Sequence, residues 1–247
     1  YIYFNILASH CTILNVMKVE IYHLLSGAEK AEGTVVVIDV FRAFSLEAYM
    51  FQKGVKKIFP VKTVEEAFAL KQQHPEYILC GERNGKIVEG FDVGNSPSQV
   101  SSLDVYGKCV IHTTSAGVQG LVSCIKADRV LTGALVNAKA VAEYIRSIHP
   151  DKVSLVAMGL NGSQKTDEDE LCARYIQSLL QGSPEQHMES LCQALKETDG
   201  KKFFDPLQQS VFPKQDFYDC IRTDSIDVVL QASKVNGVLT VENVRKH

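Results

Sequence analysis

Short apolar runs alternate with amphipathic stretches along most of this chain. The run at residues 34–38 is continuously apolar and rich in β-branched side chains. Such runs are typical of strands that are covered on both faces of a sheet. Applied along the chain, this pattern predicts strands over residues 19–24, 34–40, 57–61, 77–81, 108–113, 129–132, 152–158 and 238–241.

Polar residues mark where helices begin between these strands. Thr63 and Glu66 form the pattern of a capping box, which predicts a helix from residue 64 to about residue 74. Ser96 and Gln99 repeat that pattern, with a proline at the first helical position. Two longer helices are predicted over 138–148 and 167–180, the second ended by Gly182. Their expected N-caps are Asn137 and Thr166.

Alternating strands and helices predict an α/β fold of three layers, α/β/α, with a largely parallel mixed sheet. After Gly182 the rhythm breaks, and residues 183–222 read as a mostly helical and polar C-terminal elaboration. We expect a single α/β domain over residues 17–247. Met17 could be the natural start, so residues 1–16 are expected to be upstream sequence outside that domain.

Composition and charge narrow the function. The net charge of −3 gives no electrostatic support for a nucleic-acid partner. No apolar run reaches the ~18 residues of a membrane span, and the apolar start lacks the basic region of a signal peptide. The seven cysteines include no Cys-x-x-Cys pair, and several lie in apolar runs. This pattern predicts reduced, buried thiols and a cytoplasmic protein.

The chemistry gathers where the predicted strands end, because ligands of parallel α/β sheets bind beyond the carboxyl ends of the strands. Acids, arginines and hydroxyls follow these strands: Asp39 and Arg42, then Glu82 and Arg83, then Thr113, Thr114, Ser115 and Gly117. Together they predict a site for a phosphate and a divalent cation. Neither a P-loop nor a dinucleotide-binding fingerprint is present.

Each of these residues also has a purely structural interpretation. Asp39 could cap the next helix, the arginines could form surface ion pairs, and residues 113–117 could be an ordinary turn. Acids in the first turn of a helix, as at Glu168 and Asp169, are favoured by the helix dipole alone. We interpret His112 and Cys172 as packed core residues. Residues 81–97, by contrast, form a long polar loop, which in compact domains is usually functional.

Four motifs resemble the 2-phosphosulfolactate phosphatase family. They are Val-Ile-Asp-Val-Phe-Arg-Ala at 37–43, Ile-Phe-Pro-Val-Lys-Thr-Val-Glu-Glu-Ala at 58–67, Gly-Glu-Arg-Asn-Gly at 81–85 and Glu-Gly-Phe-Asp-Val-Gly-Asn-Ser-Pro at 89–97. Order and spacing are similar over about residues 17–180. The resemblance implies an α/β/α fold peculiar to that family. It also implies Mg²⁺-dependent hydrolysis of 2-phospho-3-sulfolactate to 3-sulfolactate and phosphate, a step of coenzyme M biosynthesis in methanogens.

The resemblance and the strand-end residues together give a predicted site. Asp39, Glu82 and Asp169 are the expected Mg²⁺ ligands, since this cation prefers oxygen. Arg42 and Arg83 would neutralise anionic charge, and Asp92 would orient the attacking water. The expected substrate-binding residues are Ser45, Asn95, Ser96, Thr113, Thr114, Ser115 and Gly117. Direct attack by water and a covalent intermediate on Asp39 both remain open.

The expected partner is a small phosphorylated acid, and neither nucleic acid nor membrane is expected; a homodimer remains open. The alternative function is a non-catalytic phospho-ligand-binding protein on the same fold. Ala116, Val118 and Gln119 stand where the family usually has asparagine, threonine and arginine. This difference predicts weaker binding of a doubly anionic substrate.

Overall fold

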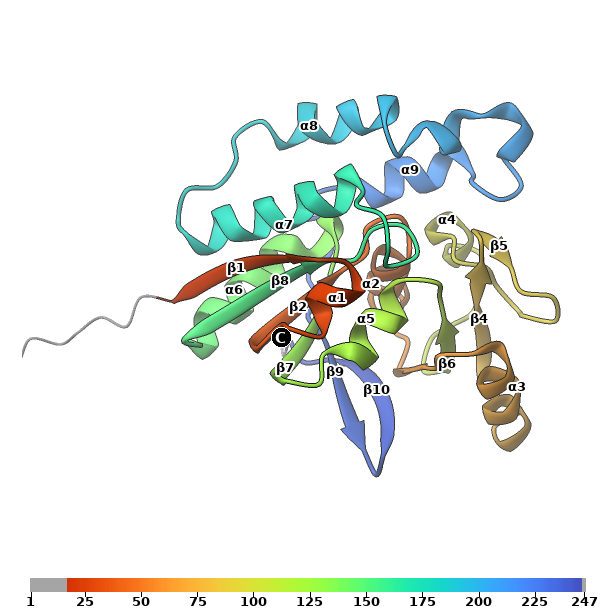
Figure 1. Cartoon of the computed structure of the whole chain (residues 1–247). Coiled ribbons are helices and arrows are strands. Elements are labelled where there is room, and N and C mark those ends of the chain that lie inside the picture. The colour runs from red at the N-terminus through yellow and green to blue at the C-terminus, as the bar shows by residue number, and fades with distance from the viewer. Residues whose placement is uncertain (1–16, 246–247) are drawn as a thin grey trace, which may run out of the picture.

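The computed structural model describes residues 17–245, and its centre is a ten-stranded mixed sheet (Figure 1). The expectation for residues 1–16 lies outside the described residues. The strands are β1 (Lys18–His23), β2 (Gly33–Ile38), β3 (Lys57–Pro60), β4 (Ile78–Arg83), β5 (Lys86–Ile87), β6 (Cys109–Thr113), β7 (Ala127–Gly133), β8 (Lys152–Ala157), β9 (Leu230–Val235) and β10 (Val238–Asn243).

The strands lie side by side in the order β1-β8-β2-β7-β9-β10-β3-β6-β4-β5. Two parallel groups, β1-β8-β2-β7 and β3-β6-β4, are joined by the antiparallel hairpin of β9 and β10. The predicted largely parallel mixed sheet is therefore confirmed. The pattern missed β9, whose apolar and polar residues alternate in a short segment, and the two-residue β5.

Helices cover both faces of the sheet and give three layers. They are α1 (Leu24–Ala28), α2 (Ala43–Gln52), α3 (Val64–Gln73), α4 (Pro97–Val100), α5 (Gly117–Ser123), α6 (Ala138–Ile148), α7 (Asp167–Leu180), α8 (Met188–Ala194) and α9 (Lys214–Cys220). Val36 and Ile38 of β2 pack with α6 and α7, whereas Val35 and Val37 pack with α2 and α5. Residues 35–38 are fully buried, as the apolar run predicts.

Predicted helix starts are confirmed, but most predicted caps are wrong. Thr63 forms the complete capping box of α3 with Glu66. α4, α6 and α7 begin where expected without a side-chain cap from Ser96, Asn137 or Thr166. The Ser96 hydroxyl donates instead to a distant carboxylate on α9, and Asn137 Oδ1 accepts the N–H of the residue three before it. Other partners have therefore taken the side chains of Ser96 and Asn137 from these helix ends.

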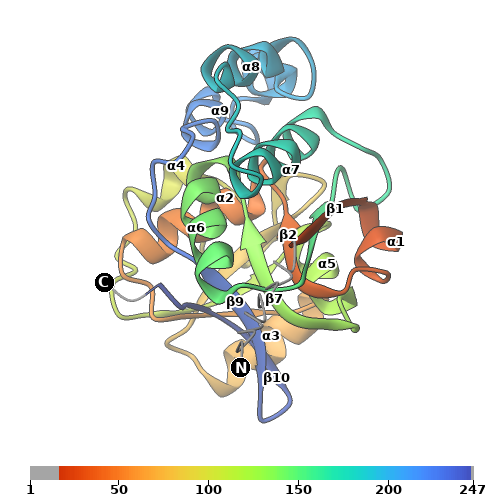
Figure 2. The same cartoon turned by 90° about the vertical axis from the view of Figure 1, so that its left-hand side faces the viewer.

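The C-terminal elaboration forms one end of the molecule. Figures 1 and 2 show α8 and α9 stacked beside α7 at that end. Short 3₁₀ turns link them, among them Lys201–Phe204 and Pro206–Gln208. An aromatic cluster anchors this segment to the loop that follows β2: the rings of Phe203 and Phe217 lie 5.0 Å and 5.8 Å from the ring of Phe41.

Two expectations from composition can be compared with the described residues. All six cysteines described in residues 17–245 are free thiols, as predicted, while Cys11 lies outside this range. Within the same range, no helix combines the length and the apolar character needed to cross a membrane.

Candidate active site

A cavity of about 380 Å³ opens at the carboxyl ends of the strands. The end of β4, the segments after β2, β4, β6 and β8, the first turn of α7 and the C-terminal elaboration form its wall. The lining residues are Asp39, Phe41, Arg42, Glu82, Asn84, Gly85, Asn95, Ser115, Ala116, Gly159, Leu160, Asn161, Thr166, Glu168, Asp169, Asp199, Lys202 and Phe212. The cavity thus lies where strand-end reasoning expected a site.

Asp39 follows β2 directly and is buried. Its Oδ1 accepts the N–H of Ala43 (3.2 Å), and its Oδ2 accepts the N–H of Gly117 (2.9 Å). Burial raises the pKa of Asp39 to about 6; the charge of Glu82 adds to the rise, and the two N–H groups oppose it. The Gly117 N–H, predicted to contact phosphate, is therefore already bonded to Asp39. A Cβ at Gly117 would lie 2.9 Å from Asp39 Oδ2, so this close approach requires glycine.

Glu82 lies in β4 and ties two loops to the cavity. Its Oε1 accepts the N–H of Ser115 (2.7 Å), and its Oε2 accepts the N–H of Gly85 (2.7 Å). Gly85 has a φ of +79°, a conformation that favours glycine. The carboxylate is therefore fixed in position by the same turn that brings it to the cavity.

Asp169 lies in the first turn of α7 and reaches back to the ends of β2 and β8. Its Oδ1 accepts the N–H of Val40 and its Oδ2 that of Gly159, both at 2.8 Å. Burial raises its pKa well above the ordinary range, and the neighbouring charges of Glu168 and Asp39 raise it further. All three predicted ligands therefore line the same cavity.

Glu168 is a functional candidate that was not predicted from the sequence, where the helix dipole alone explained an acid at this position. It is buried and lines the cavity, and its Oε2 has no hydrogen-bond partner among the described residues. Burial raises the pKa of Glu168 to about 8, although the nearby charge of Lys202 opposes the shift. This rise in pKa favours the protonated carboxyl group near neutral pH. The run of four acids at the start of α7 is the sequence feature that could have indicated Glu168 as a site residue.

The acids do not form a ready-made metal centre. Within residues 17–245, no group of three or more His, Cys, Asp or Glu side chains is arranged to hold a metal ion. Their chemistry nonetheless fits Mg²⁺, which is commonly held by one or two carboxylates together with water and substrate phosphate. Asn95 Oδ1, buried at the cavity with no hydrogen-bond partner among residues 17–245, is a further oxygen ligand for a metal ion.

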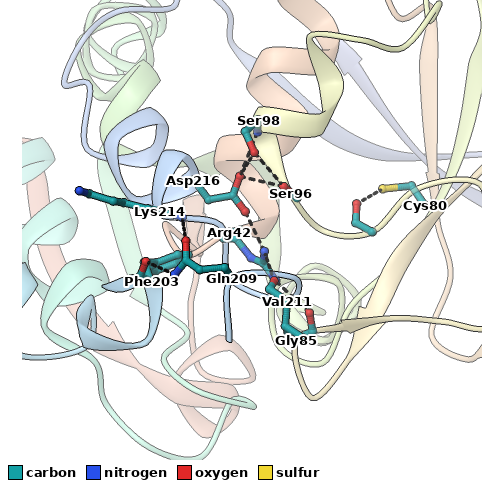
Figure 3. A network of polar contacts seen from close by, with 11 residues as sticks. Arg42, Cys80, Gly85, Ser96, Ser98, Phe203, Gln209, Val211, Lys214 and Asp216 are labelled. Atoms are coloured by element: carbon teal, nitrogen blue, oxygen red, sulfur yellow. Dashed lines mark hydrogen bonds and ion pairs between the residues drawn. The ribbon is translucent and has the colours of Figure 1, made fainter. Parts of the chain in front are cut away.

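Arg42 lines the cavity and is held from three sides (Figure 3). Its Nη1 donates to the Val211 carbonyl and to Asp216 Oδ2, both at 2.8 Å, and its Nη2 donates to the Gly85 carbonyl at 2.9 Å. The ring of Phe212 lies 4.8 Å from the guanidinium carbon. The predicted location of Arg42 at the site is observed, and its side chain is only 3% exposed.

Asp216, on α9, is the counter-ion that the sequence did not indicate. Its side chain is fully buried. Its Oδ1 accepts hydrogen bonds from Ser96 Oγ (2.8 Å), Ser98 Oγ (2.6 Å) and Ser98 N (3.0 Å), as Figure 3 shows. One carboxylate of the C-terminal elaboration therefore joins Arg42 to the start of α4.

Several predicted site residues lie outside the cavity wall: Arg83, Asp92, Ser45, Ser96, Thr113, Thr114 and Gly117. Arg83 donates to the Glu82 carbonyl and to Thr113 Oγ1. Asp92 is half exposed; its Oδ2 accepts the N–H of Leu79 and lies 3.5 Å from Lys71 Nζ. This placement does not support a water-orienting role for Asp92.

The hydroxyl groups of the remaining predicted residues are engaged in the fold. Ser45 Oγ donates to the Val40 carbonyl, and Thr114 Oγ1 accepts the N–H of Val118. Ser115 and Asn95 are the predicted substrate-binding residues that do line the cavity.

Of the three positions that differ from the usual family pattern, one lines the cavity and two do not. Ala116 lines the cavity, but Val118 is buried and Gln119 Nε2 donates to the Lys62 carbonyl. The weaker binding expected from these differences stays a prediction. His112 is a packed residue as interpreted, fully buried with Nδ1 2.8 Å from Glu47 Oε1.

Comparison with known proteins identifies the family. A family model described as 2-phosphosulpholactate phosphatase matches residues 20–235. A relative from Bacillus subtilis, described as a probable 2-phosphosulfolactate phosphatase, is 32% identical over 215 residues, covering 85% of this chain and 91% of the relative. Relatives with the same description are 39% identical in Carboxydothermus hydrogenoformans (66% of this chain, 68% of the relative) and 37% identical in Clostridium perfringens (68% and 70%). The chain therefore belongs to the 2-phosphosulpholactate phosphatase family and is a phosphatase, a hydrolase of phosphoric monoesters.

Proposed function

We propose that this chain hydrolyses 2-phospho-3-sulfolactate to 3-sulfolactate and phosphate in the cavity at the carboxyl ends of the strands. The observation that carries the proposal is the convergence of Asp39, Glu82 and Asp169 on that cavity. Each carboxylate is fixed by two backbone N–H groups. Acids held this rigidly, with pKa values raised by burial at Asp39 and Asp169, are typical of a catalytic site.

Membership of a phosphatase family suggests a divalent metal ion, and we propose Mg²⁺. Asp39, Glu82 and Asp169 are the residues that would hold it, each with lone pairs not used by its backbone partner. The ion, when bound, supplies Lewis-acid stabilisation of phosphoryl charge.

The chain itself supplies positioning and a proton. Arg42, oriented by its fixed partners, presents its remaining N–H donors to the phosphoryl oxygens. Water attacks phosphorus, and the bond from phosphorus to the ester oxygen breaks. We assign Glu168 as the general acid that gives its proton to the departing ester oxygen, because burial keeps its carboxyl group protonated at neutral pH. The proton lost by the attacking water then restores Glu168.

We also propose a single domain over residues 17–247 and a cytoplasmic location. The two groups of β-strands share one hydrogen-bonded sheet, which supports a single domain. The free thiols of the described cysteines support a reducing compartment.

Phosphate release tests the proposed reaction. Wild-type protein should release phosphate from 2-phospho-3-sulfolactate, lose that activity in EDTA and regain it with added Mg²⁺. Recovery with Mn²⁺ but not Mg²⁺ would correct the metal alone. Binding of the ester, measured by calorimetry, without any phosphate release would instead favour a phospho-ligand-binding protein.

A further inference from the structure

The cavity wall carries two cationic side chains among the described residues, and they are in different electrostatic situations. Arg42 is paired with the buried carboxylate of Asp216. Lys202 is not paired: within residues 17–245, no carboxylate lies within ion-pair distance of its ammonium group, and the group makes no hydrogen bond there. Lys202 therefore brings to the cavity a positive charge that no carboxylate of the described part of the chain neutralises at contact distance.

Three aromatic rings surround this ammonium group. Its Nζ lies 5.8 Å from the ring centre of Phe41 and 5.5 Å from those of Phe203 and Phe212. Phe41 and Phe212 also line the cavity. Ring faces attract a cation through their quadrupole but carry no net charge. They can therefore hold the ammonium group in place while leaving its charge available to an anion.

The backbone of Lys202 is also fixed. Lys202 lies in the 3₁₀ turn Lys201–Phe204, and the next residue, Phe203, is fully buried. Phe203 makes an edge contact with Phe41 and another with Phe212. The buried Phe203 thus fixes the turn that carries Lys202. The neighbouring Lys201 is exposed.

We propose that Lys202 is the specificity residue that binds a second anionic group of the substrate, a carboxylate or a sulfonate. This inference rests on the proposed function, since it assumes that the phosphoryl group binds to Arg42 and the proposed metal ligands of the same cavity. The substrate class that follows is a phosphomonoester of a small organic acid. A phosphomonoester without a second anion would gain nothing from Lys202.

The test compares substrates that differ only in the second anion. Lys202→Met keeps the apolar stem against the rings and removes the charge. It should lower kcat/KM for 2-phospho-3-sulfolactate about tenfold to a hundredfold, the effect of losing one charge-assisted hydrogen bond. With p-nitrophenyl phosphate the change should stay within about threefold, and Lys202→Arg should restore most of the loss because it keeps the charge. Lys201→Met, on the same turn, is the matched control and should behave as wild type.

A third substrate, phospholactate, separates the two anions. An equal loss with phospholactate assigns Lys202 to the carboxylate, and a loss seen only with the sulfonated ester assigns it to the sulfonate. Equal losses for all esters, p-nitrophenyl phosphate included, would overturn the proposal, as would no loss for any of them.

Failure of the proposed function gives a different result. If wild-type protein releases phosphate from no ester, calorimetric titration with 3-sulfolactate decides the role of Lys202 separately. Binding that weakens at least about tenfold in Lys202→Met supports the anion subsite. Unchanged affinity, or no binding by wild type, overturns it.

Discussion

Asp216→Ala removes the only ion-pair partner that Arg42 has among the described residues. The two side chains are 0% and 3% exposed, and the distance between Nη1 and Oδ2 is 2.8 Å. Removing one member of a buried ion pair typically costs about 3–5 kcal/mol, because the other charge is left buried without compensation. For a chain of this size, such a loss corresponds to a melting temperature lower by roughly 6–20 °C.

A more exposed ion pair with the same distance provides the control. Arg245 Nη2 lies 2.8 Å from Glu143 Oε2, but these side chains are 26% and 35% exposed. Glu143→Ala should cost at most about 1 kcal/mol, since solvent screens exposed pairs. Asp216→Asn keeps the shape of the side chain and loses its charge, so its loss should fall between the two.

Urea unfolding followed by circular dichroism measures all three variants. We expect the order Asp216→Ala, Asp216→Asn, Glu143→Ala, from the largest loss in the free energy of unfolding to the smallest. If Asp216→Ala costs no more than Glu143→Ala, Asp216 does not hold Arg42 as described.

Three further outcomes are expected. Glu168→Gln should lower kcat for 2-phospho-3-sulfolactate by about 10²–10⁴-fold, but affect p-nitrophenyl phosphate far less, because that leaving group needs no proton; equal losses would contradict a general-acid role. In metal-free protein, the raised pKa of Asp39 means that the folded state holds this proton more tightly than the unfolded state. The stabilisation from this proton is therefore present below pH 4 and lost as the pH rises through 6, by up to ~3 kcal/mol in the free energy of unfolding relative to Asp39→Asn. If urea unfolding gives the same difference in free energy between wild type and Asp39→Asn at pH 4 and at pH 7.5, this expectation is wrong. Titration of the denatured, non-reduced protein should find seven thiols, and fewer would count against the cytoplasmic proposal.

The central strands could be predicted because burial on both faces leaves a direct mark on the sequence. Residues 34–38 form a continuous apolar run, and both faces of β2 are covered by helices. The caps were less predictable, because a side chain near a helix end bonds whichever partner is closest in space. Ser96 had the sequence of an N-cap, yet its hydroxyl donates to a carboxylate 120 positions later.

Some residues of the candidate site could likewise be predicted from the sequence, and others could not. Asp39, Glu82 and Arg42 could be placed because they lie at or just after the ends of strands, and strand ends meet at one edge of a parallel sheet. Lys202 and Phe212 come from the C-terminal elaboration, where no strand rhythm indicates which residues turn toward the sheet. Asp92 lies in the long polar loop that was expected to be functional, but its carboxylate fixes that loop to β4 rather than lining the cavity, so its role stays a prediction.

The most direct test of the site is the rate of phosphate release from 2-phospho-3-sulfolactate by wild type, Asp39→Asn and Asp104→Asn in the presence of Mg²⁺. Asp39 lines the cavity, whereas Asp104 is 81% exposed and pairs with Lys108 away from it. We expect Asp39→Asn to lose at least about 10²-fold in kcat while remaining folded by circular dichroism, and Asp104→Asn to match wild type within about twofold. A folded Asp39→Asn protein that hydrolyses the ester as fast as wild type would contradict the assignment of this cavity as the active site.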